Sequence, residues 1–174
     1  MTVPEQSAGT LATLAGSWTL DPDHSSITFT TKAAWLFPVK GTAKAISGGG
    51  QVDANGTVSG SLVFDAASID TKNQKRDTHL RTADFFEVDT YPTFTFTVTG
   101  ARPLNPGQVE LSGTLTIRDQ TRPVTLTAAV QSSDTAATLS TEFDIDRSDW
   151  GLTWAKMGAG LVNHVVIQAQ FTKG

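Results

Sequence analysis

Apolar and polar residues alternate along most of this chain, and this period of two limits the fold more than any other feature. Ile27 and Phe29 occupy one face of a predicted strand, whereas Thr28 and Thr30 occupy the other. Threonine suits the outer face of a pleated strand because it is β-branched yet polar. The later apolar positions that follow the same alternation are Val58, Leu62, Phe64, Phe94, Phe96, Val98, Val109, Leu111, Leu115, Ile117, Val124, Leu126, Ala128, Val130, Leu139, Phe143, Ile145, Val165, Ile167 and Phe171.

Turn-forming residues separate these runs at short intervals, which predicts an all-β, up-and-down meander, either a sandwich or a barrel. Roughly eight strands that close on themselves would leave an interior filled by side chains or by one ligand. The alternation does not decide between these two interiors. The predicted turns are Ser47–Gly50, Asp53–Gly56, Asn105–Gly107, Arg118–Gln120 and Ser132–Asp134.

One segment, residues 71–84, departs from the alternation and predicts a short helix. It is rich in charge and lacks β-branched runs, Asp70 or Thr71 could cap it, and Asp77 with Arg81 forms a favourable i,i+4 pair. Phe85 directly follows this segment and is expected to fix its end to the barrel.

Composition favours one soluble-type domain without nucleic acid as its partner. The 174 residues fit a single barrel domain over residues 15–174 after a flexible leader at 1–14. The net charge is -4 and the basic residues are scattered, which argues against binding phosphate backbones. No signal-peptide pattern and no membrane span is expected, so a cytoplasmic location is predicted. The chain has no cysteine, which excludes disulfides and thiolate metal sites.

The polar residues that could carry chemistry form no recognised catalytic or metal motif. His24 is expected to close a turn before the first long strand, with Ser25. Asp77 and His79 are expected to tie the short helix to the barrel through hydrogen bonds. No catalytic residue, no metal site and no cofactor is predicted. An enzyme that works through His24, Asp77 and His79 is kept as the alternative.

Several motifs, taken together, resemble the YceI-like family of polyisoprenoid-binding, lipocalin-like proteins. The strongest block spans residues 68–86 and contains Arg76-Asp77-x-His79-Leu80-Arg81, followed by Tyr91-Pro92. The other motifs are Trp18-x-x-Asp21-x-x-His24-Ser25-x-Ile27-x-Phe29, Gly113-x-Leu115-Thr116-Ile117, Thr121-x-Pro123-Val124-x-Leu126 and Ile145-x-Arg147-Ser148-Asp149-Trp150-Gly151.

This resemblance implies an extended antiparallel lipocalin-like β-barrel with one short helix near an end and a polyisoprenoid in an apolar tube. It also implies a homodimer. The sequence departs from the family at Ala33, where a histidine is usual, and at Ala43, where an aromatic residue is usual. Asn163-His164 stands where an acidic residue is more common.

The leading hypothesis is therefore a binding protein that carries, stores or sequesters a long apolar lipid, either a polyisoprenoid or an isoprenoid quinone, in a continuous tube. A structural, stress-associated barrel without ligand is the remaining alternative. A loop beginning at Trp150 is expected to act as a lid, and Arg76, Arg81 or Lys156 to favour an anionic head group. The candidate ligand-binding residues are Phe29, Trp35, Phe85, Phe94, Phe96, Leu115, Ile117, Phe143, Ile145, Trp150, Trp154, Arg76, Arg81 and Lys156.

Overall fold

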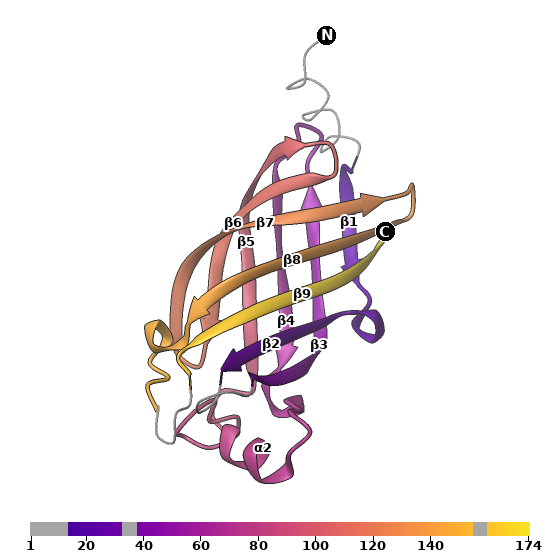
Figure 1. The fold of residues 1–174 in the computed structure, drawn as a ribbon. Coiled ribbons are helices and arrows are strands. Elements are labelled where there is room, and N and C mark those ends of the chain that lie inside the picture. The colour runs from indigo at the N-terminus through magenta and orange to yellow at the C-terminus, as the bar shows by residue number, and fades with distance from the viewer. Residues whose placement is uncertain (1–13, 33–37, 155–159) are drawn as a thin grey trace.

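The strands of the protein form one antiparallel sheet that wraps around a long apolar core (Figure 1). The computed structural model describes residues 14–32, 38–154 and 160–174. The strands are β1 (Gly16–Leu20), β2 (Ser26–Lys32), β3 (Pro38–Val52), β4 (Val58–Asp65), β5 (Thr93–Asn105), β6 (Gln108–Ile117), β7 (Gln120–Ser132), β8 (Ala136–Asp146) and β9 (Val162–Lys173). The helical elements of the described residues are η1 (Pro22–His24), η2 (Ala66–Ser68), α2 (Gln74–Leu80) and η3 (Arg147–Trp150).

The sheet closes because β1 and β2 share one strand position between β3 and β9. Ile27 on β2 lies opposite Ala43 of β3 and Ile167 of β9, whereas Leu20 on β1 lies opposite Phe171 farther along β9. Every other strand pairs with its neighbours in the chain, so the nine-stranded sheet closes with eight strand positions. The predicted barrel of about eight strands is confirmed, and closure excludes the sandwich.

The short turn η1 joins the two halves of this shared position without breaking the hydrogen bonding around it. The side chain of Asp21 accepts from the backbone N–H of Asp23 at 3.1 Å and bonds Nδ1 of His24 at 2.7 Å. The hydroxyl of Ser25 donates to the Asp21 carbonyl at 2.7 Å and accepts from the Gln170 N–H at 3.0 Å. The predicted turn at His24 and Ser25 is confirmed, and it belongs to the closure of the barrel.

The segment Ser47–Gly50, which contains three successive glycines, lies within β3, so the turn predicted there is wrong. A Cβ atom on Gly49 would lie 2.6 Å from the Trp18 carbonyl oxygen of β1, and one on Gly60 would lie 2.5 Å from the Gly49 carbonyl oxygen. The glycines are therefore explained by close backbone approach between β1, β3 and β4 rather than by a change in chain direction. The other four predicted turns connect strands as expected.

The predicted short helix exists, but it is shorter than expected and is capped by Asn73. The Asn73 side chain accepts the backbone N–H of Arg76 at 3.0 Å, as an N-cap residue does. Asp70 instead accepts the N–H of Lys72, whose φ of 64° places it in the left-handed region just before the helix. Figure 1 shows that α2 and its flanking segments lie across one end of the barrel.

Phe64 provides a direct test of how much the barrel depends on its packed interior. This ring is 1% exposed, and Phe64→Ala should lower the free energy of unfolding by about 3–5 kcal/mol, because it removes a buried ring and leaves a cavity. Urea denaturation measures this loss. Leu104→Ala is the control, since Leu104 is 37% exposed and its loss should cost about 0.5 kcal/mol or less. Equal effects of the two substitutions would contradict the observed packing.

Candidate functional site

A cavity of about 590 Å³ lies inside the end of the barrel that α2 covers, and we call it the main cavity. Its volume falls within the range of about 300–1,000 Å³ that is typical of small-molecule sites. Aliphatic and aromatic side chains from β2, β5, β6, β8 and β9 form its walls. The apolar lining residues are Ile27, Phe29, Val39, Leu80, Phe85, Phe86, Phe94, Leu115, Ile117, Ile145, Leu152, Trp154 and Val165.

Most polar groups of the main cavity come from α2 and the residue before it. Asn73 and Lys75 are exposed, while Arg76 and His79 are half-buried. These four residues form what we call the rim. Because the rim lies where the helix crosses the end of the barrel, these four polar groups stand at one end of the chamber. Its other polar lining residues are Thr31, Arg147 and Asn163.

His79 is the rim residue with the most contacts to aromatic rings of the cavity. Its ring meets Phe85 edge-on with centroids 5.2 Å apart, and meets Trp154 edge-on at 4.6 Å. Its Nε2 bonds the Asp84 carboxylate at 2.8 Å. His79 therefore joins the helix to the aromatic wall by ring contacts. We expected His79 to form a hydrogen bond to the barrel, but its partner Asp84 lies in the loop after the helix.

Arg147 is a buried cation in the wall of the main cavity. Its guanidinium donates to the Leu152 carbonyl at 2.7 Å and to the Gly160 carbonyl at 3.0 Å, and it lies 5.3 Å from the centre of the Phe85 ring. Burial lowers the pKa of Arg147, and the nearby charge of Asp146 opposes this shift. These contacts fix the segment that carries Leu152 and Trp154 against the barrel end.

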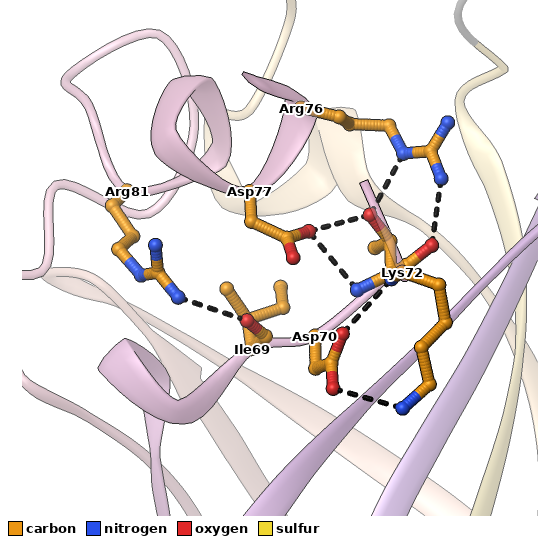
Figure 2. A network of polar contacts seen from close by, with 7 residues as sticks. Ile69, Asp70, Lys72, Arg76, Asp77 and Arg81 are labelled. Atoms are coloured by element: carbon orange, nitrogen blue, oxygen red, sulfur yellow. Dashed lines mark hydrogen bonds and ion pairs between the residues drawn. The ribbon is translucent and has the colours of Figure 1, made fainter. Parts of the chain in front are cut away.

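A buried polar network holds α2 in place over the cavity (Figure 2). The Asp77 carboxylate accepts both the backbone N–H of Thr71, at 3.0 Å, and its hydroxyl. Arg76 donates to the hydroxyl and the carbonyl of Thr71, each at 2.8 Å. The neighbouring residue Asp70 is bridged to Thr42 of β3. Asp77 therefore holds the helix to the segment before it, and the helix reaches the barrel through the bridge from Asp70 to β3 rather than through the direct bond that we expected.

Arg81 belongs to the polar network that holds α2 in place, and not to the lining of the main cavity. Its guanidinium donates to the Ile69 carbonyl at 3.1 Å (Figure 2) and to the Ala67 carbonyl at 3.0 Å. These bonds stand in place of the i,i+4 pair with Asp77 that the sequence suggested. The side chain of Arg81 does not line either cavity of the described residues.

A second cavity of about 140 Å³ lies farther along the barrel, toward the end opposite α2. Its walls include Trp18 of β1, Phe96 of β5 and Leu111 of β6. Among the described residues, the two cavities share no lining residue. The continuous tube that we predicted is therefore wrong for this structure. Alternation specifies which side chains point inward, but not whether side chains from opposite walls meet.

Most candidate ligand-binding residues do gather around the main cavity. The structure places Phe29, Phe85, Phe94, Leu115, Ile117, Ile145, Trp154 and Arg76 along its lining. Phe96 lines the second cavity. Trp35 and Lys156 lie outside the described residues, as do Ala33 and most of the leader.

Two further candidates lie in the wall without lining either cavity of the described part. Trp150 is buried in η3, and its indole N–H donates to the Leu115 carbonyl at 2.8 Å. That bond fixes the ring in the barrel, so Trp150 itself is not part of a mobile lid. Phe143 of β8 lies between Thr141, which lines the second cavity, and Ile145, which lines the main one.

Sequence reasoning missed some lining residues. Ile27 and Val165 follow the same alternation and could have been included on that ground. Asn163 also follows the alternation of β9, but its polar side chain gave no apolar signal. Arg147 and Leu152 had no such signal, because their positions depend on how the η3 turn folds back over the barrel end.

The groups proposed for an alternative catalytic site bond to different partners. His24 bonds Asp21, Asp77 bonds Thr71, and His79 bonds Asp84. Within the described ranges, His, Asp and Glu residues nowhere gather in threes at metal-binding geometry. Across the same residues, no helix has the length and apolar character needed to span a bilayer.

A closed antiparallel barrel with an internal cavity places the protein in the lipocalin-like class of β-barrels. The chain belongs to the YceI-like family, because the model of the YceI-like domain matches residues 18–172.

Related sequences agree with this assignment. A UPF0312 protein of Vibrio cholerae is 33% identical over 107 residues, which cover 60% of this chain and 57% of that protein. Protein YceI of Escherichia coli O157:H7 is 34% identical over 97 residues, or 55% of this chain and 49% of that protein. The aligned region thus spans about half the length of these curated relatives.

Solved structures agree in fold. BcnA of Burkholderia cenocepacia matches with a TM-score of 0.75 and 23% identity, covering 89% of this chain and 99% of that one. A polyisoprenoid binding domain from Saccharophagus degradans matches with a TM-score of 0.70 and 18% identity, covering 90% and 98%.

The departures at Ala43 and Asn163-His164 have clear positions in the fold. Ala43 is buried in β3 and lines neither cavity of the described residues. Asn163 points inward to the main cavity, whereas His164 is on the outer face of β9. The departure therefore places an amide, rather than a charge, inside the barrel end.

His164 should make folding stability depend on pH. Its Nδ1 bonds Asp144 at 2.7 Å, and this hydrogen bond is the main cause that raises the pKa of His164. A raised folded pKa means that the stabilising contribution is complete below the unfolded pKa of about 6.5 and is lost as pH rises through the folded value.

We therefore expect His164→Gln to destabilise the protein more at about pH 5.5 than at about pH 8. Urea denaturation of both proteins at the two pH values measures this difference. Asp144→Asn on β8 should reduce the difference without abolishing it, because Glu142 still lies 3.7 Å from Nε2 of His164 and also raises its pKa. A loss that is the same at both pH values would show that the His164 pair does not couple folding to protonation.

Proposed function

We propose that the protein binds a long apolar lipid, a polyisoprenoid or an isoprenoid quinone, in the main cavity and thereby carries, stores or sequesters it. One observation carries this proposal: a chamber of about 590 Å³ has aliphatic and aromatic walls, with its charged rim at one end. This arrangement suits a molecule with a long hydrocarbon part and a small polar end.

The energetics favour such a ligand. Removing about 400 Å² of hydrocarbon from water contributes about 10 kcal/mol. Association costs about 4–15 kcal/mol in lost freedom of motion, so burial of the chain alone offsets most or all of this cost. Selectivity would then depend on the width and length of the chamber more than on the head group.

The rim supports recognition of a polar or anionic end. Lys75 is exposed at the rim and is not committed to an ion pair among the described residues. Arg76 donates two hydrogen bonds to Thr71 and contributes its charge from a fixed position. The Saccharophagus degradans structure is of a polyisoprenoid binding domain, and its shared fold adds support for a ligand of this type.

An enzymatic role through His24, Asp77 and His79 has less support, because these groups bond to separate partners. We still predict that the protein is not an enzyme, that it needs no cofactor and that it forms a homodimer.

Ile117→Trp tests the proposal by narrowing the main cavity with an apolar side chain. Ile117 lies on the inner face of β6. We expect the affinity for geranylgeraniol to fall at least about tenfold, because about 55 Å² less hydrocarbon would be buried. Native mass spectrometry measures this affinity.

Ser112→Trp is the matched control, since Ser112 is exposed on the outer face of the same strand. Near-UV circular dichroism verifies that both variants are folded. Equal binding by the parent and folded Ile117→Trp, or no binding of any long apolar molecule by the parent, would contradict the proposal.

A further inference from the structure

The boundary between the two cavities is only one layer of side chains thick. On β5, Phe94 lines the main cavity and the next inward residue, Phe96, lines the second. On β9, Val165 and Ile167 divide in the same way. Alternate residues of a strand lie about 7 Å apart, so the two apolar spaces approach each other within the width of one side chain.

Large side chains fill this boundary from several sides of the barrel. Phe64 of β4 is 1% exposed and Phe96 is 2% exposed. Phe143 of β8 stands between residues that line opposite cavities, and Ile167 completes the layer on β9. We call these four residues the partition.

Phe96 is the member of the partition that most directly separates the two spaces. It lines the second cavity, while its partner across the strand pair, Leu115, lines the main cavity. Its other cross-strand partner, Leu62, also lines the second cavity. Removal of the Phe96 ring would therefore open space on the second-cavity side directly behind Leu115 and Phe94.

We propose that Phe96 determines the length of apolar chain that the barrel accepts, by backing the floor of the main cavity behind the lining residues Phe94 and Leu115. This inference rests on the proposed function. A chain that enters past the rim buries more hydrocarbon with each added unit until its end meets the partition. Further units then stay outside the rim in water and add no affinity. The partition prevents the ligand from entering the second cavity, which is an apolar space of about 140 Å³.

The resulting signature is a plateau in affinity as chain length grows. In the parent protein, affinity rises along a series of prenyl alcohols and then levels off. In Phe96→Ala, the plateau moves to a longer chain because the end can continue into the second cavity. Each additional 55 Å² or so of buried chain should raise affinity about tenfold.

The experiment is native mass spectrometry of folded protein with an equimolar mixture of geraniol, farnesol, geranylgeraniol and solanesol. Phe96→Ala should shift the occupancy toward the longer alcohols by about tenfold relative to the parent. Phe96→Leu retains part of the floor and should shift it in the same direction by less. It also provides the test if Phe96→Ala does not fold.

Val98→Phe is the matched control because it fills the second cavity without touching the main one. Val98 lines the second cavity, and its cross-strand partners are the glycines Gly60 and Gly113. Alone, Val98→Phe should leave the chain-length profile unchanged. Combined with either Phe96 substitution, it should restore the plateau of the parent.

The outcomes separate this inference from the proposed function. A parent that binds prenyl alcohols with the same profile as folded Phe96 variants, or with no plateau, overturns the role of Phe96 but leaves lipid binding intact. A shift that survives Val98→Phe overturns the route through the second cavity. A parent that binds none of the alcohols overturns the proposed function, and the inference with it.

Discussion

Hydrogen-bonded closure of the sheet is the constraint on which the rest of the structure depends. β3 and β9 meet only through β1 and β2, which together fill the position between them. Ser25 and Asp21 keep the backbone satisfied where this position changes from one strand to the other. Closure removes free sheet edges and gives every strand an inner and an outer face, which makes an enclosed apolar space available.

The end of the barrel that holds the main cavity depends on a separate feature, the polar network that holds α2 in place. Asp77 and Arg81 fasten α2 to the segment around Ile69, and that segment is bridged to β3 through Asp70. Each of these groups has its partner inside the protein, so the helix can lie over an apolar chamber without burying an unpaired charge. The aromatic contacts of His79 then join the helix to the cavity wall.

The sequence predicted the inner faces of the strands well, because the pleat forces alternate side chains to one side. Leu115, Ile117 and Ile145 were expected to point inward on this basis, and they do. The glycines of β3 were misinterpreted as a turn, since close approach between backbones and a change of direction both favour glycine. The partition was not predictable, because strand register and tilt across the whole barrel decide which inward side chains lie at the same height, as Phe96 does with Leu62 and Leu115.

The most direct test of lipid binding in the main cavity is a crystal structure of the protein soaked or co-crystallised with geranylgeraniol. We expect continuous ligand density in the main cavity, between Phe29 and Ile117, with the hydroxyl end at the rim and the far end against the partition. An empty main cavity beside ligand bound elsewhere on the surface, at saturating ligand, would contradict this expectation.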